Sequence, residues 1–91
     1  MADQVAPQSL ENEERVLGAI LLSPKALDAV SELLAPNDFY RATHGLIFQA
    51  ALNLYQAGKG VDVGTVVGEL ERRGLLEQVG GQSRISELAV N

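Results

Sequence analysis

The stretch PNDFYRATHGLIFQAALNLYQAGKG, residues 36–60, contains every aromatic residue of this 91-residue chain and its only histidine. After Tyr40 the segment is largely apolar as far as Ala57, and its apolar side chains cover more than one narrow helical face. Gly58 then supplies the residue type that most often ends a helix. The pattern therefore predicts a long central helix that other helices contact from several sides. We expect the core to include Phe39, Phe48 and Tyr55.

Two helices are predicted before this segment. Ser9 suits the N-cap of a helix over residues 10–22, whose first turns are rich in glutamate, the charge that the positive end of a helix dipole favours. Ser23 is expected to cap a second helix, with Pro24 at its first position and Pro36 as its stop. The buried stripe of this second helix is expected to consist of Leu27, Val30, Leu33 and Leu34.

Two further helices are predicted after residue 60. Asp62 is expected to cap a helix over residues 63–73, because valines and a leucine recur there at helical spacing and Gly74 follows. The segment LLEQVGG, residues 75–81, indicates a turn with an apolar plug. A last helix is predicted to begin near Gln82.

No segment alternates apolar and polar residues with period two, so we predict an all-α fold: a compact bundle of about five short helices around the long central helix. Residues 1–8 are interpreted as a flexible leader and residues 9–91 as one helical domain. Four glycines inside predicted helices each weaken them by roughly 0.5–1 kcal/mol relative to alanine. We therefore expect helices to approach closely at some of them, which are Gly18, Gly45, Gly64 and Gly68.

The composition excludes several kinds of protein. Seven basic and twelve acidic side chains give a formal net charge of −5, and the basic residues are scattered. Tight binding of a nucleic-acid backbone needs several cations on one face, so this composition disfavours it. The absence of cysteine and the single histidine exclude a disulfide framework and a Cys/His zinc site. No apolar run predicts a transmembrane helix, and no signal peptide is indicated.

Two motifs suggest chemistry, and each has a simpler interpretation. The Gly-Lys-Gly at residues 58–60 lacks the upstream glycine and the following Ser or Thr of a phosphate-binding loop, so we interpret it as a helix end and a turn. His44 and Asp38 form the only possible acid–base pair, but no further polar group or cleft is indicated around them. We predict that His44 is a half-buried structural histidine.

Two groups of cations complete the candidates. Arg41 lies among aromatic residues that could stack on single-stranded bases, but such platforms lie in electropositive grooves and this chain is acidic. Arg72 and Arg73 are interpreted as a solvated helix end. Residues 63–73 are too rich in valine and glutamate for a DNA-recognition helix. From its residues alone the chain is therefore an interaction or scaffold domain, with no catalytic, cofactor-binding or metal-binding residue assigned and its binding residues unknown.

Four segments resemble the N-terminal domain of the bacterial replicative DNA helicase of the DnaB type. They are PQSLENEERVLGAIL (7–21), DFYRATHGLIFQA (38–50), GKGVDVGTV (58–66) and ELERRGLLEQVGG (69–81). Their order and spacing match that family, and the resemblance covers residues 7 to about 90. The sequence departs from the family pattern at Arg84, where an aromatic residue is usual, and at glycines 45, 64 and 68.

The resemblance implies a helical subdomain at the front of a longer chain, followed in that family by a helical hairpin, a linker and a RecA-type ATPase domain. The complete enzyme is a hexameric ring that hydrolyses nucleoside triphosphate with Mg²⁺ and unwinds DNA 5′ to 3′. Its N-terminal domains form a collar and bind primase, and helicase loaders contact this layer in some systems.

For this chain, the resemblance implies a non-catalytic interaction and assembly domain in the bacterial cytoplasm, truncated before the hairpin. ATP and Mg²⁺ belong to the ATPase domain of the family, so we expect no cofactor in residues 9–91. The expected partners are primase, other helicase subunits and, in some systems, a loader, without tight DNA binding and without a membrane.

Two alternatives remain open at this point. The chain could be a stand-alone or phage-type module that binds primase or the helicase ring, which a natural stop after Asn91 would favour. It could also be a small DNA-binding helical domain, which a DNA titration at low salt would test. We expect the isolated chain to be a monomer.

Overall fold

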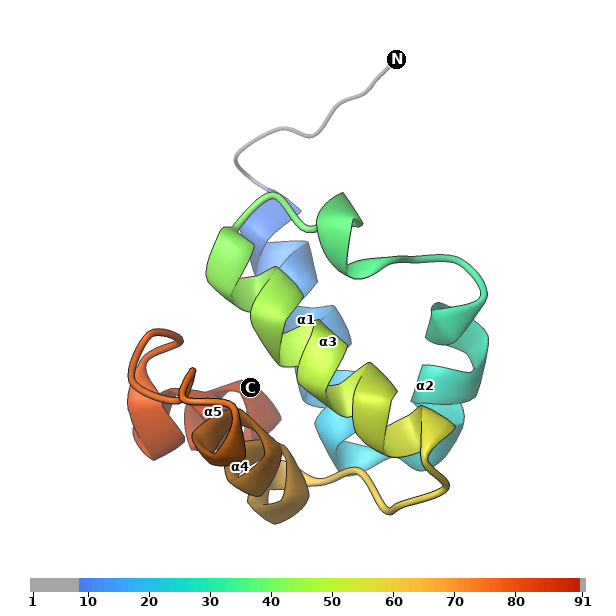
Figure 1. Ribbon diagram of the computed structural model, residues 1–91. Helices are drawn as coiled ribbons and strands as arrows, with labels where there is room; N and C mark the ends of the chain where they lie inside the picture. The colour runs from blue at the N-terminus through green and yellow to red at the C-terminus, as the bar shows by residue number, and fades with distance from the viewer. Residues whose placement is uncertain (1–8, 91) are drawn as a thin grey trace.

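The computed structural model describes residues 9–90, and within that range it is a bundle of helices without strands (Figure 1). The elements are α1 (Ser9–Leu22), α2 (Pro24–Ser31), the 3-10 helix η1 (Pro36–Asp38), α3 (Ala42–Gln56), α4 (Val63–Arg72) and α5 (Gly81–Val90). The predicted all-α fold with five α-helices is confirmed. The leader predicted for residues 1–8 lies outside the described residues. None of the helices described is long and apolar enough to cross a membrane.

The long helix α3 is the centre of the bundle, as predicted. It packs against α1, α2, α4 and η1, while α5 lies against both α1 and α4. Figure 1 shows α3 crossing in front of α1, with α2 on one side and the α4–α5 pair on the other. The apolar faces of all five helices meet in one core, where each large aliphatic side chain contributes about 1.5–3 kcal/mol. Its fully buried members include Leu17, Ile20, Leu27, Ile47, Phe48, Val66, Leu70, Ile85 and Leu88.

Helix α2 is shorter than predicted: it ends at Ser31, whereas Pro36 was expected to stop it. Pro36 begins η1 instead, and Ala35 before it is extended (φ −116°, ψ 161°), the backbone state that a following proline favours. Leu33 lies beyond the end of α2 and is 79% exposed, so the predicted stripe is wrong at this residue. Leu27 is fully buried, as predicted. The other two members of the stripe, Val30 and Leu34, are partly buried against the core.

Of the predicted N-caps, Asp62 is confirmed by its hydrogen bonds, whereas α1 already begins at Ser9. The Asp62 carboxylate accepts a hydrogen bond from the Thr65 N–H, and the Thr65 hydroxyl accepts one from the Asp62 N–H, both at 2.9 Å. Such a reciprocal pair satisfies N–H groups that a helix start leaves without partners. Ser23 occupies the N-cap of α2, but its side chain makes no capping hydrogen bond. Gly58 and Gly74 follow α3 and α4 in the left-handed conformation, with φ of 75° and 72°.

Close approach at a helical glycine is confirmed at Gly45. A Cβ atom at this position would lie 2.7 Å from the backbone oxygen of Pro36, so η1 packs onto the start of α3 because residue 45 has no side chain. The other helical glycines with a described environment show no close approach: a Cβ at Gly68 would meet nothing within 4 Å, and one at Gly64 would make only an ordinary 3.5 Å contact. Gly18 is buried in α1.

Candidate functional site

His44, in the first turn of α3, is 1% exposed. Its Nδ1 lies 2.8 Å from Oε1 of Glu13 on α1, and its Nε2 lies 3.2 Å from Nη2 of Arg84 on α5. A carboxylate only accepts hydrogen bonds and a guanidinium only donates them. These partners therefore fix one tautomer, with the proton on Nδ1 and the lone pair of Nε2 turned to Arg84.

Glu13 connects α1 to the start of α3. Its buried carboxylate accepts hydrogen bonds from His44 Nδ1, from the Tyr40 N–H and, at 3.4 Å, from the Arg41 N–H. These backbone N–H groups lie at the helix entry, where intrahelical acceptors are missing. The negative charge also lies at the positive end of the α3 dipole. One side chain of α1 thus provides hydrogen-bond acceptors for groups at the start of α3, about thirty residues later in the sequence.

Arg84 joins α5 to the same cluster. Its Nη2 donates to Oε2 of Glu14 at 2.7 Å, and its Nη1 lies 3.4 Å from Oε1 of Glu87. The hydrogen bond from Arg84 outweighs partial desolvation and holds the pKa of the Glu14 carboxyl below its usual value. We call the set Glu13, Glu14, His44 and Arg84 the interhelix network, because it joins α1, α3 and α5.

His44 and Asp38, the only acid–base pair that the sequence offers, do not contact each other through their side chains. Asp38 belongs to η1, where its carboxylate accepts a hydrogen bond from the Ala35 N–H at 2.8 Å. His44 is also fully buried, not half-buried, and both of its ring nitrogens already have partners. A general base needs a free lone pair within reach of a substrate. The geometry therefore favours a structural role for His44.

The sequence contains a signal for Glu13 that our pattern analysis missed. Glu13 lies three residues after Leu10 and four before Leu17, on the apolar stripe of α1. A carboxylate in that register has to find hydrogen-bond donors inside the fold. Arg84 gives no comparable signal, because its partners His44 and Glu14 lie 40 and 70 residues away.

The aromatic residues divide between the core and the surface. Phe39 and Phe48 are buried with ring centroids 5.0 Å apart, so their predicted place in the core is confirmed. The prediction is wrong for Tyr55, which is 37% exposed and donates its hydroxyl to Asp28 on α2. That hydrogen bond to a carboxylate raises the pKa of the Tyr55 hydroxyl. Tyr40 is exposed as well.

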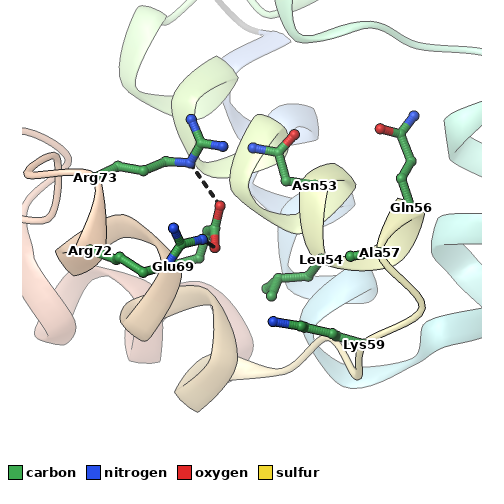
Figure 2. A pocket seen from close by; sticks show the side chains of 8 residues that line it. All are labelled: Asn53, Leu54, Gln56, Ala57, Lys59, Glu69, Arg72 and Arg73. Atoms are coloured by element: carbon green, nitrogen blue, oxygen red, sulfur yellow. Dashed lines mark hydrogen bonds and ion pairs between the residues drawn. The ribbon is translucent and has the colours of Figure 1, made fainter.

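A second cluster of charges lines an open hollow between the end of α3 and α4 (Figure 2). The hollow measures about 420 Å³, and its lining consists of Asn53, Leu54, Gln56, Ala57, Lys59, Glu69, Arg72 and Arg73. We call it the cationic hollow. Glu69 is 6% exposed and uses both oxygens: Oε2 accepts from Nε of Arg73 at 2.7 Å, and Oε1 accepts from Nη2 of Arg72.

The charged side chains of the cationic hollow differ in their exposure to solvent. Hydrogen bonds from Arg73 and Arg72 hold the pKa of the Glu69 carboxyl below its usual value. The Arg72 and Arg73 side chains are 69% and 46% exposed, which confirms the predicted solvated helix end and adds Glu69 as its anchor.

Lys59 is exposed in the turn after α3, where its N–H donates to the Leu54 carbonyl at 2.9 Å. The predicted helix end and turn at Gly-Lys-Gly are confirmed. Within residues 9–90, no three His, Cys, Asp or Glu side chains gather as a metal site would require.

Residues 5–91 match the family described as the DnaB-like helicase N terminal domain. The chain belongs to this family. It is 49% identical over 88 residues to the replicative DNA helicase DnaB of Geobacillus stearothermophilus and 48% identical over 87 residues to the replicative DNA helicase DnaC of Bacillus subtilis (strain 168). These alignments cover 97% and 96% of this chain but 19% of each relative, so the chain spans about a fifth of their length.

The DnaB-like fold is also found in a solved structure. The crystal structure of the N-terminal domain of DnaB helicase from Mycobacterium tuberculosis matches with a TM-score of 0.89 and 45% identity, over 92% of this chain and 61% of that one. The resemblance carried by the four motifs is therefore confirmed. Two of the residues that we expect to depart from the DnaB pattern make specific contacts: Arg84 bonds to Glu14 and His44, and Gly45 admits the backbone of Pro36.

Proposed function

We propose that this chain is the non-catalytic interaction and assembly domain at the N-terminal end of a replicative DNA helicase. The observation that carries the proposal is the DnaB-like family match over residues 5–91, together with relatives that are named replicative DNA helicases. Because the chain spans 19% of those relatives, we assign ATP hydrolysis with Mg²⁺ and duplex unwinding to other parts of such a protein.

The proposed role has two components. The domain contributes to the collar of a hexameric ring, and it provides a surface on which primase docks; a helicase loader is a further proposed partner. The fold supports such a role, because an internal polar network and a single core give the bundle a defined shape for its partners. Partners recognise rigid surfaces at a lower entropic cost than mobile ones.

A titration of the chain with the primase of the same bacterium tests the docking component. We expect saturable binding by isothermal calorimetry, no nucleotide hydrolysis, and no affinity for single- or double-stranded DNA at low salt. Absence of primase binding together with DNA binding at low salt would overturn the proposal in favour of a small DNA-binding domain.

The assembly component is tested in the full-length helicase. The test compares, by sedimentation velocity, the hexamer fraction of the complete protein with that of a variant lacking residues 9–90. We expect fewer hexamers without the domain, and an unchanged hexamer fraction would remove the assembly component. The isolated chain is expected to sediment as a monomer.

A further inference from the structure

The cationic hollow concentrates positive charge on an acidic chain. Three of the seven basic residues, Lys59, Arg72 and Arg73, line one hollow, and Glu69 is its only carboxylate. Three cations against one anion leave a formal local charge of +2, whereas the whole chain carries −5. Such a patch attracts anionic groups, while the rest of the surface repels extended polyanions.

The arginines of this hollow are held in place with donors to spare. Glu69 takes one N–H group from each guanidinium, through Nη2 of Arg72 and Nε of Arg73. A guanidinium has five N–H donors, so most of them remain directed to solvent from these partly exposed side chains. Because the buried Glu69 already restrains both side chains, binding a further anion loses less conformational entropy than it would at unrestrained arginines.

The α3 side of the hollow suits a peptide better than a bare ion. Asn53 accepts a hydrogen bond from Gln49 through its Oδ1 at 2.9 Å, which leaves its amide N–H groups to donate. Leu54 and Ala57 add apolar surface, and Figure 2 shows Lys59 extending across the hollow toward α4. A volume of about 420 Å³ accommodates one or two side chains with their backbone.

We propose that the cationic hollow between α3 and α4 docks an acidic peptide segment of a protein partner, with one carboxylate bound by Arg72 and Arg73 and a second near Lys59. This inference rests on the proposed function, since it assigns a surface to the interaction domain. A nucleic-acid backbone fits less well, because it needs a track of cations and these three occupy one hollow.

The test uses short fluorescent peptides and amide chemical shifts of the chain. A glutamate-rich peptide is expected to shift resonances of residues 53–59 and 69–73, and its glutamine counterpart is not. Lys59→Glu combined with Arg73→Glu is expected to weaken binding by tenfold or more, since two charge-assisted contacts become repulsive. The matched control, Arg15→Glu combined with Lys25→Glu, reverses two exposed cations outside the hollow and is expected to bind within about twofold of the unmodified chain.

Three results would overturn the inference: equal binding of both peptides, equal binding by the double variant, or a single-stranded oligonucleotide that shifts the same residues more strongly. The unfolding curve of the double variant verifies that it is folded. The primase titration separates this inference from the proposed function. Primase binding without any acidic-peptide binding refutes the hollow and leaves the proposed function standing. Peptide binding without primase binding removes the primase-docking component of that function and leaves the hollow as a docking site for an acidic segment of another partner.

Discussion

The interhelix network and the cationic hollow are built from the same side-chain types in opposite ways. In the network, Glu13 and Glu14 find partners on α3 and α5, at sequence separations of 31 and 70 residues. In the hollow, Glu69 bonds to both arginines at the end of its own helix, three and four residues away. The carboxylates of the interhelix network therefore join three helices, whereas the carboxylate of the cationic hollow bonds only within the segment of α4.

This difference in sequence separation has consequences for stability and for binding. A network whose members come from distant segments forms only when the whole bundle is assembled, so it favours one arrangement of the helices. Pairs at i, i+3 and i, i+4 form within a helix and stabilise it by a few tenths of a kcal/mol. The arginines of the hollow therefore contribute little to the fold and keep donors available to a partner.

Glu13→Gln is expected to have the largest effect on stability. The amide oxygen replaces only one of the two carboxylate oxygens, so the NH₂ group of glutamine faces either the Tyr40 N–H or the Nδ1–H of His44. Buried donors left without acceptors lower the free energy of unfolding by about 2–4 kcal/mol. Urea denaturation measures this change, and the exposed Glu11→Gln on the same helix is the matched control. A loss no larger than that of Glu11→Gln would remove the network as a determinant of the fold.

A Gly→Ala substitution is expected to act with opposite sign at two helical glycines, Gly45 beside His44 of the interhelix network and Gly68 beside Glu69 of the cationic hollow. Gly45→Ala places a methyl group 2.7 Å from the Pro36 carbonyl oxygen, a backbone atom, so η1 or α3 must shift and stability falls by about 1–2 kcal/mol. Gly68→Ala meets nothing within 4 Å and is expected to raise stability by about 0.5–1 kcal/mol, because alanine favours the helix. Thermal unfolding of both variants gives the comparison. A rise in stability for both variants would show that helix propensity, not the contact with Pro36, controls residue 45.

Sequence reasoning predicted the features that depend on neighbouring residues. The Asp62 cap and the ends of α3 and α4 follow from local hydrogen bonding and backbone conformation, and all three are confirmed. The end of α2 was missed, because Leu33 continues the apolar spacing although the chain turns toward Pro36. Spacing indicates which residues could share a helical face, but it does not say where the chain leaves the helix.

The candidate sites show the same limit. Arg72 and Arg73 were interpreted correctly as a helix end, since their environment is their own helix. The sequence predicts a structural His44, but it does not identify the partner, Glu13, which lies on α1. Tyr55 was placed in the core although its hydroxyl bonds to Asp28 at the surface. Partners separated by about thirty residues or more depend on how helices pack, which one sequence does not reveal.

The smallest expected effect concerns acid sensitivity in the cationic hollow. The pKa of the Glu69 carboxyl is lowered by Arg73 and Arg72, so its charge stabilises the fold above the ordinary carboxyl pKa. That contribution is lost as the pH falls through the lowered pKa, because protonated Glu69 no longer attracts the arginines. Glu69→Gln removes it at every pH. The stability difference between the unmodified chain and the variant is therefore expected to be present at neutral pH and to shrink as the pH falls through the lowered pKa of Glu69.

Denaturation curves at several pH values measure this convergence, and the exposed Glu71→Gln on the same helix is the control for a change of formal charge alone. If the difference instead persists in acid, Glu69 acts through packing, and the hollow then resembles the interhelix network more than a surface ion pair. Convergence would mean that Glu69 acts on the fold through its charge alone, as expected of pairs formed within one helix. The interhelix network and the cationic hollow contain the same kinds of charged group. Their different contributions to the free energy of unfolding would then follow from how far apart in the sequence the bonded residues lie.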